Sequence, residues 1–473
     1  MTTSHNTIDW DRATAECVEH LQALIRIPSV NPPGVSDGAA GRDSSGGETA
    51  AARYCAEVLV SAGIAAQVLE TLPGRGSCFA RLPATVANAD PPLVLLSHLD
   101  VVPVDAESWT HDPFGGELID GVIWGRGAVD MKDMVAMELS VMLALARFGG
   151  ERSRDVIFAA VADEEAGGVF GAGHWVSERP DLFADASGRP AAAALNEVGG
   201  YSMTIGGRRI YAIQVAEKGI AWTRMRATGT TGHGSMPHPD NAALKLAEAV
   251  TRLNNAPRPA RVTPVVDAFL GALDLSEVAD AIRAGDEAAA FGALESRVDD
   301  PVLRRSLSAM LRDTVTTTMI QVGKKMNVIP GSGEAQIDIR TLPGTDQDAL
   351  IAELQATVGD LAQVEPVVML PSIEAAGDAP LVGLMRNALL SADPEAMAAP
   401  MMITLGTDAK ALATIGIPVY GFAPLQLGPA DPFLSLFHGH DERVPVSALR
   451  FGLPVLHEVV SRFASAEPGL IGD

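Results

Sequence analysis

The stretch Leu93-Val94-Leu95-Leu96-Ser97-His98-Leu99-Asp100 decides which fold this chain can adopt. Its four apolar residues predict a buried strand, and His98 and Asp100 come directly after that strand. In an open α/β sheet, ligands bind in the crevice outside the carboxyl ends of the strands. A histidine there can offer one ring nitrogen to a metal ion while a neighbouring carboxylate orients the ring. A single His-x-Asp is more often a surface pair, so its meaning depends on the residues at the ends of the other strands.

Length and composition describe a globular protein with more than one domain. The chain has 473 residues, which exceeds the size at which one hydrophobic core keeps growing. Its 35 basic and 59 acidic residues give a net charge of -24, which argues against binding to nucleic acid or to an anionic membrane. The sequence has no pattern of a signal peptide and no apolar run long enough to cross a bilayer. Three cysteines without CxxC spacing are typical of reduced thiols, so we expect a cytoplasmic protein.

The order of apolar segments predicts an α/β domain that is interrupted by an insertion. Strand-like runs at 93–96, 156–162 and 191–195 alternate with a helix over 134–148. We expect the Pro- and Gly-bearing stretches 31–48 and 73–92 to be surface connections.

A different pattern begins near residue 217 and predicts a separate α+β domain. It contains a strand over 220–227, a helix from Asn241, a stretch over 264–313 that looks helical throughout, and strands near 315–322 and 334–339. The helix–strand alternation returns afterwards. We therefore expect a catalytic domain formed by 1–216 and 376–473, with an inserted domain over 217–375.

Other predicted strands also end in acidic side chains. Glu164 and Glu165 come after the run 156–162, and Glu197 comes after the run 191–195. Asp130 stands before the predicted helix, and a loop near the C-terminus contains His438. Carboxylates gathered at one sheet edge repel each other unless a cation lies among them. Histidine and carboxylate ligands without thiolate suit a catalytic zinc site, in which one carboxylate can bridge two ions.

Each of these residues, taken alone, also has a structural explanation. Asp130 could be a helix N-cap, and the glutamates could be solvated strand exits. Turns or surface pairs could account for His233, Asn327, and Arg340 beside Asp338, and 406–408 could only shape a loop. The interpretation as a metal site therefore depends on the whole set.

Together the segments resemble the di-zinc peptidase and deacylase family that includes aminoacylase, glutamate carboxypeptidase, carnosinase, acetylornithine deacetylase and succinyl-diaminopimelate desuccinylase. The resemblance covers nearly the whole chain. It rests on SHLDVVP (97–103), WGRGAVDMK (124–132), DEEAGG (163–168), NE (196–197), GHGSMP (232–237), NVIP (327–330), DIR (338–340), GTD (406–408) and HGHDE (438–442). The helical stretch 264–313 is most similar to the carboxypeptidase S and N-acyl amino acid hydrolase branch. The resemblance implies a zinc-peptidase-type α/β/α catalytic domain with an inserted α+β lid and dimerisation domain.

The resemblance also implies a role for each matching residue. Two divalent ions, most simply zinc with cobalt or manganese as alternatives, would be held by His98, Asp130, Glu165, Glu197 and His438, with Asp130 as the bridge. His440 is the competing terminal ligand. Asp100 would orient His98, Glu164 would be the general base, and His233 from a partner subunit would stabilise the oxyanion. The substrate would contact Asn327, Arg340, Gly406 and Thr407.

We therefore expect a metal-dependent hydrolase that cleaves the amide bond of N-acyl amino acids or of short peptides with a free carboxylate. An aminopeptidase or dipeptidase with the same metal site is the nearest alternative. A non-catalytic binding protein is the alternative from another class, and loss of Glu164 or His98 would mark it, whereas this chain keeps both. The resemblance further implies a homodimer formed through the inserted domain, with no nucleic-acid or membrane partner.

Overall fold

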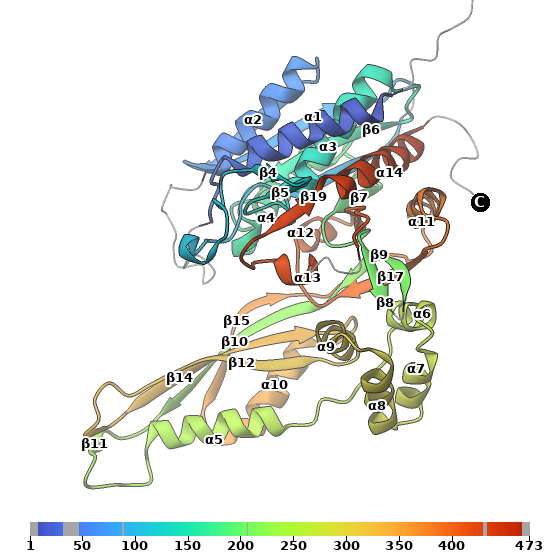
Figure 1. Cartoon of the computed structure of the whole chain (residues 1–473). Helices are drawn as coiled ribbons and strands as arrows, with labels where there is room; N and C mark the ends of the chain where they lie inside the picture. Colours follow the sequence, from blue (N-terminus) through green and yellow to red (C-terminus); the bar gives the residue numbers. More distant parts are fainter. Residues whose placement is uncertain (1–7, 32–46, 88, 206, 429–432, 466–473) are drawn as a thin grey trace, which may run out of the picture. The chain divides into compact units, whose positions relative to one another are not determined.

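The computed structural model describes residues 8–31, 47–87, 89–205, 207–428 and 433–465 (Figure 1). The chain divides into two compact units. Unit 1 comprises Met1–Val215, Ala375–Met401 and Thr407–Asp473, and unit 2 comprises Ala216–Glu374 and Met402–Gly406. Every helix among the described residues is too short or too polar to cross a bilayer.

Unit 1 is built on a mixed sheet whose central strands are parallel. The order is β1 (Ala66–Leu72), β2 (Arg75–Leu82), β6 (Arg154–Val161), β3 (Asp90–His98), β7 (Ala193–Asn196), β18 (Val419–Gly421) and β9 (Arg208–Glu217), and β8 (Ser202–Ile205) and β17 (Met397–Ile403) also pair with β9. Strand β3 is parallel to β6 on one side and to β7 on the other, and β18 is parallel to β7. These four strands therefore end at the same edge of the sheet.

Helices cover the central strands of unit 1. Helix α3 (Lys132–Phe148) is buried from Lys132 to Leu145 and packs against β3 and β6. Helices α1 (Trp10–Ile25) and α14 (Val446–Ala464) contact α3, and α11 (Pro380–Ala392) contacts α14 (Figure 1). Helix α2 (Glu48–Ser61) packs on β1 and β2, whereas α4 (Ala172–Glu178) contacts α12 (Ala409–Ala413). Because β3 is covered in this way, its residues from Leu93 to His98 are all buried.

The interpretation of 73–92 as a surface connection is wrong where strands form, and it holds only for the turn at 73–74 and for residues 83–87 and 89. Residues Arg75–Leu82 form β2, a largely buried strand between β1 and β6, and Asp90 already begins β3. Only the turn between β1 and β2 fits the glycine signal, because Gly74 has a φ of 85° there. Most of the other predicted connection, 31–48, lies outside the described residues, and Glu48 begins α2.

A small antiparallel sheet joins two distant parts of unit 1. Strand β5 (Val122–Trp124) pairs with β4 (Glu117–Ile119) on one side and with β19 (Arg443–Pro445) on the other. In this register Arg443 is opposite Trp124. The residues just after β5 and those just before β19 are therefore neighbours, and both segments carry predicted site residues.

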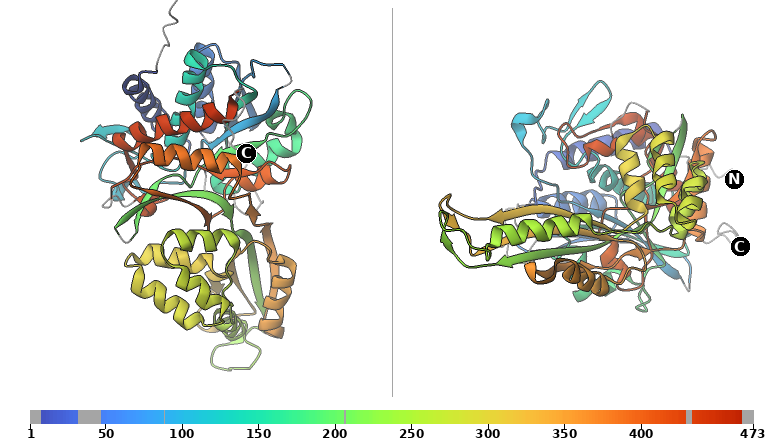
Figure 2. Two further views of the ribbon diagram at one scale, coloured as in Figure 1. Left: turned by 90° about the vertical axis from the view of Figure 1, so that its right-hand side faces the viewer. Right: turned by 90° about the horizontal axis from the view of Figure 1, so that it is seen from below.

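Unit 2 contains a four-stranded antiparallel sheet with helices packed on it. The order is β12 (Thr314–Val322), β14 (Ser332–Thr341), β10 (Gly219–Thr228) and β15 (Gln363–Leu370). Helices α5 (Ala242–Asn255) and α10 (Gln347–Val358) supply Leu246, Leu253, Leu350 and Leu354 to a common core with the sheet. Figure 2 shows α5, in yellow-green, lying along these strands. Strand β16 (Ile373–Glu374) pairs with the last two residues of β9.

The helical stretch of unit 2 is not continuous. It consists of α6 (Pro264–Ala272), α7 (Ser276–Arg283), α8 (Glu287–Arg297) and α9 (Pro301–Met310), and it ends before residue 313. The left-handed backbone at Asp274 (φ 57°) and Gly285 (φ 79°) separates the first three helices. Pro301 begins the fourth helix at a position where a missing N–H costs nothing. The apolar pattern was therefore read correctly as helical, but the breaks within it were missed.

Candidate metal centre

Three neighbouring parallel strands of unit 1 end next to a side chain that can bind a metal ion. His98 is the last residue of β3, and Glu197 comes directly after the last residue of β7. Glu164 and Glu165 lie in a short 3-10 turn, η2 (Glu164–Ala166), just beyond β6. The turn is entered through Asp163, whose φ is 71°. Each side chain therefore stands at the carboxyl edge of the sheet, where ligands bind in this class of fold.

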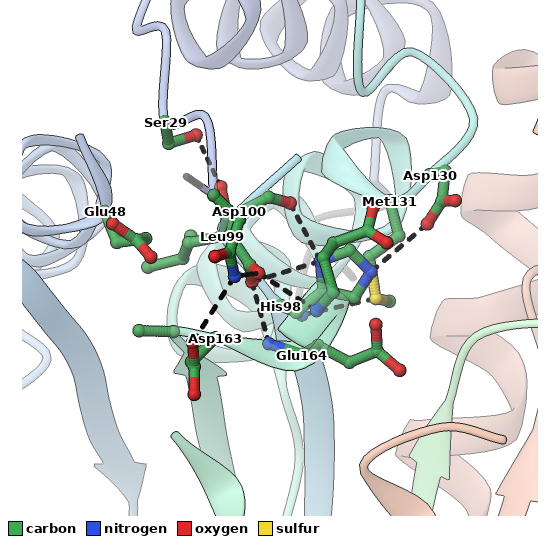
Figure 3. A network of polar contacts seen from close by, with 12 residues as sticks. Ser29, Glu48, His98, Leu99, Asp100, Asp130, Met131, Asp163 and Glu164 are labelled. Atoms are coloured by element: carbon green, nitrogen blue, oxygen red, sulfur yellow. Dashed lines mark hydrogen bonds and ion pairs between the residues drawn. The ribbon is translucent and has the colours of Figure 1, made fainter. Parts of the chain in front are cut away.

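Asp130 connects two histidines that are far apart in the sequence. Its Oδ1 lies 3.2 Å from Nε2 of His98, and its Oδ2 lies 3.2 Å from Nε2 of His438. Figure 3 shows Asp130 and His98 facing each other. Glu197 Oε2 is 3.7 Å from Nε2 of His98, and Glu165 Oε2 is 3.0 Å from Nε2 of His438. A carboxylate with one oxygen toward each imidazole has the arrangement of a bridging ligand.

Two sets of three side chains each bring their potential ligand atoms within 4.8 Å of one another. One set is His98, Glu164 and Glu197, and the other is His98, Asp130 and Glu165. The structure thus brings together the predicted metal ligands at the ends of β3, β6 and β7 and Asp130, which lies in the loop between β5 and α3. It also places Glu164, the predicted base, among them. His438 adjoins the second set through Asp130 and Glu165.

The carboxylates of this cluster lie close together and are buried or partly buried, so a bound cation would stabilise their charged forms. Burial, together with the charge of Glu197, raises the pKa of Glu164 well above its ordinary value. Burial and the charge of Asp130 raise the pKa of Glu165 to about 7. Burial alone would lower the pKa of His98, but the surrounding carboxylates, first Glu197, raise it well above its ordinary value. Contacts with Asp130 and Glu165 raise the pKa of His438 to about 10.

The donor atoms of the cluster fit divalent cations. They are imidazole nitrogens and carboxylate oxygens, the set found in catalytic zinc sites and in sites for similar metals. In addition, Oε1 of Glu165 is buried and has no hydrogen-bond partner among the described residues. A buried carboxylate oxygen without a partner is costly, and a bound cation would remove that cost.

Asp100 is buried beside this cluster, and it contacts both His98 and the backbone of the turn that carries Glu164 and Glu165. Its Oδ1 accepts from the backbone N–H of Glu164 at 3.1 Å, and its Oδ2 accepts from that of Glu165 at 3.0 Å. Nδ1 of His98 lies 2.9 Å from the backbone oxygen of Asp100 and 3.6 Å from its Oδ1. The carbonyl of Asp100 therefore makes the shorter contact with the ring. The carboxylate fixes the turn that presents both glutamates, a task that the sequence did not indicate.

A buried polar network behind Asp100 was also missed by the sequence analysis. Asn31 Nδ2 donates to Asp100 Oδ2 at 2.7 Å, and Arg75 donates to Asn31 Oδ1 at 3.1 Å. Arg75 forms ion pairs with Glu48 and, at 3.3 Å, with Asp163 (Figure 3 shows both acids near Asp100). If β2 had been recognised as a buried strand, Arg75 could have been identified as a buried charge that needs partners.

The segment 406–408 contains one further carboxyl group of the site. Thr407 Oγ1 accepts from Asn196 Nδ2 at 2.9 Å, which fixes Thr407 beside the end of β7. Asp408 is buried, its charge interacts with that of Glu164, and its Oδ2 has no hydrogen-bond partner among the described residues. The sequence analysis quoted all three residues as a motif but gave a substrate role only to Gly406 and Thr407. Gly406 belongs to unit 2.

The other predicted substrate residues lie in unit 2. His233 is an exposed residue of β11 (Gly232–His233), which pairs with β13 (Val328–Ile329). Its Nδ1 lies 2.7 Å from Oγ of Ser235 and 3.2 Å from the backbone nitrogen of Ser235. The backbone oxygen of Asn327 accepts from Gly234 N at 2.9 Å, which keeps Asn327 close to His233. Arg340 forms an ion pair with Asp338 at 2.7 Å.

The chain is similar to known hydrolases along most of its length. Residues 94–462 match the model of peptidase family M20/M25/M40. A probable carboxypeptidase S-like 2 of Dictyostelium discoideum is 28% identical over 382 residues, which cover 75% of this chain and 68% of that protein. Aminoacylase-1 of Sus scrofa is 28% identical over 427 residues, which cover 88% and 90%. The solved structure of the di-peptidase Dug1p from Saccharomyces cerevisiae matches with a TM-score of 0.68 at 13% identity, covering 97% of this chain and 98% of that one.

Proposed function

This chain belongs to peptidase family M20/M25/M40, and from that premise we propose that it hydrolyses the amide bond of N-acyl amino acids or of short peptides with a free carboxylate. It is a hydrolase of the metallopeptidase type. The observation that carries the proposal is the gathering of His98, Asp130, Glu165 and Glu197 around Glu164 at one sheet edge. The names of the relatives, a carboxypeptidase S-like protein and an aminoacylase, support this class of substrate.

Two divalent ions would be held by five side chains. His98 and Glu197 would bind one ion, Glu165 and His438 would bind the other, and Asp130 would bridge them. Zinc is the ion that we propose, with cobalt and manganese as alternatives, since imidazole and carboxylate ligands suit all three. Such ions supply positive charge that polarises a scissile carbonyl and favours the ionisation of water.

Glu164 would act as the general base. Its position is fixed by the hydrogen bond from its backbone N–H to Asp100, and burial raises its pKa well above that of an exposed carboxyl. A raised pKa suits a group that must accept a proton near neutral pH and then deliver it to the leaving amine. The retained glutamate also argues against a non-catalytic binding protein.

His233 would donate a hydrogen bond to the developing oxyanion. Ser235 contacts its Nδ1 through both Oγ and the backbone nitrogen, so Nε2 is the ring nitrogen that would donate. We propose that this histidine acts from a partner subunit, in a homodimer formed through the inserted domain 217–375. The exposed apolar side chains on β12, Met319, Ile320 and Val322, support an interface on that domain.

Arg340 and Asn327 would hold the substrate, together with Gly406 and Thr407. The planar guanidinium of Arg340 can bind a carboxylate through two parallel hydrogen bonds. At present it donates to Asp338, so substrate would share or replace that partner. The three cysteines are buried and free, which supports a reducing, cytoplasmic location.

A substrate screen tests the proposal. Purified protein loaded with zinc, cobalt or manganese would be assayed against N-acetyl amino acids and dipeptides, with and without chelator. We expect hydrolysis that chelator abolishes and that re-added metal restores, and we expect an amidated C-terminus to remove it. If a blocked N-terminus abolishes turnover and a blocked C-terminus does not, the aminopeptidase or dipeptidase alternative holds. If no metal promotes amide hydrolysis, the proposal is wrong.

A further inference from the structure

The loop that carries Asp130 is held by one buried carboxylate. Oε1 of Glu442 accepts from the backbone N–H groups of Val129 at 2.8 Å and Asp130 at 3.0 Å. Its Oε2 accepts from Gly127 N at 2.9 Å and from Nη1 of Arg126 at 2.6 Å. Four donors on one carboxylate fix the backbone of Asp130, because any shift of the loop would break several charged hydrogen bonds together.

Arg126 makes a second contact with the segment 438–442, which carries both Glu442 and His438. Its Nη1 reaches Glu442, and its Nη2 donates to the backbone oxygen of Gly439 at 2.9 Å. The guanidinium also lies over the ring of Trp109 at 5.2 Å, and the residue is 2% exposed. One side chain from the Asp130 loop therefore holds two points of the segment 438–442, and the fixed shape of its guanidinium defines how that segment lies against the loop.

His438 depends on such an anchor more than the other proposed ligands do. Its side chain is 58% exposed, whereas those of His98, Asp130 and Glu165 are 9% exposed or less. Its backbone has a left-handed φ of 58°, which is unfavourable for a residue with a side chain. Little packing thus fixes the ring of His438, and the hydrogen bond to the carbonyl of the next residue, Gly439, is a direct restraint on it.

We propose that Arg126 is a positioning residue that sets the Asp130 loop against the His438 segment and thereby forms the second metal site, made of Asp130, Glu165 and His438. The inference rests on the proposed function, since it needs two ions. Arg126 touches neither ion. It acts through Glu442 on Asp130 and through Gly439 on His438.

The test is the number and affinity of bound ions in the variant Arg126→Lys. Lysine keeps the buried positive charge beside Glu442, but it lacks the planar guanidinium that donates to Glu442 and Gly439 at the same time. In titrations of the metal-free full chain with zinc and with manganese, we expect one ion to bind as in wild type. The other ion should bind about 10–100-fold more weakly, which is the typical effect of losing a residue that orients the metal ligands. An Arg126→Ala variant should regain the second ion when guanidinium is added.

Arg443→Lys is a matched control. Arg443 also lies over a tryptophan, Trp124, at 4.7 Å, and it donates to a backbone oxygen of the same segment, that of Asp441, at 2.7 Å. It has no role in the proposed contact, so both ions should bind as in wild type.

Three outcomes with the variants would overturn the inference. Arg126→Lys could bind both ions with wild-type affinity, it could lose both ions equally, or Arg443→Lys could show the same loss. A wild-type chain that binds two ions but hydrolyses no amide would contradict the proposed function and leave this inference intact. A wild-type chain that binds no metal would overturn both.

Discussion

Replacement of Asp100 by Asn tests how a buried residue that binds no metal itself supports the proposed metal ligands. Asparagine keeps the shape of the side chain but offers one acceptor oxygen instead of two. If that oxygen takes the place of Oδ2, it keeps the bonds from Asn31 and Glu165, and the new amide NH2 faces the N–H of Glu164. The opposite orientation leaves two donors without an acceptor and is worse. The favoured orientation therefore leaves one buried donor unsatisfied, which costs about 1–3 kcal/mol.

The same change should weaken metal binding. The turn that presents Glu164 and Glu165 loses one of its two anchors, and His98 loses the nearby charge of Oδ1. Loss of such a supporting group typically weakens metal binding about 10–100-fold, which is about 1.4–2.8 kcal/mol. At saturating metal, the extra stability that the ions give to the folded state falls by this amount.

Urea unfolding with excess metal and with chelator measures that extra stability directly. We expect Asp100→Asn to reduce the difference between the two conditions by about 1.4–2.8 kcal/mol. Asp155→Asn is the control, because Asp155 also accepts from a backbone N–H, that of Ala84 at 2.7 Å, and from Arg81 at 2.6 Å. It should lower stability in both conditions equally. Full metal stabilisation in Asp100→Asn, or an equal loss in Asp155→Asn, would refute the reasoning.

Three further predictions concern the histidines. His438→Ala should lose one of two bound ions in a metal analysis, and His440→Ala should keep both, whereas the reverse result would make His440 the ligand. If His233 acts across a dimer, mixing His233→Ala with Glu164→Gln protein should partly restore activity, and a verified mixed dimer without activity would place His233 in cis. Burial lowers the pKa of His457 from 6.5 to about 4, so the unfolded chain takes up the proton first as the pH falls. Stability should therefore fall by up to about 1.4 kcal/mol per pH unit between about pH 6 and pH 4. In acid unfolding, His457→Leu should lack this loss of stability. A pH profile equal to that of wild type would refute the lowered pKa of His457.

The sequence placed four of the proposed site residues at one sheet edge, because His98, Glu164, Glu165 and Glu197 each follow a recognisable apolar run. β3 and β6 are continuous apolar strands, so His98 and Glu164 could be placed at one sheet edge without coordinates. Asp130 and His438 have no such local signal. Their assignment depended on resemblance, and in the structure a small sheet brings their segments together.

The supporting groups could not be predicted for a physical reason. Asn31, Arg75 and Glu442 act through partners that are distant in the sequence, and no periodic pattern marks such contacts. β2 was missed because the prolines and glycines of 73–92 suggested a loop, although Gly74 lies in the turn and Gly76 lies within β2. Once β2 is recognised, the burial of Arg75 requires acids around it, and Glu48 and Asp163 meet that need.

The most direct test of the central claim is a parallel measurement of turnover and bound metal in Glu164→Gln. Glutamine keeps the size of the side chain and removes its ability to accept the proton, so kcat should fall by about 10²–10⁴-fold. We expect the protein to keep two ions per chain, because Glu164 is proposed as the base and not as a ligand. Its place beside His98 and Glu197 makes this a demanding test. Turnover close to that of wild type, or loss of an ion together with activity, would contradict the account.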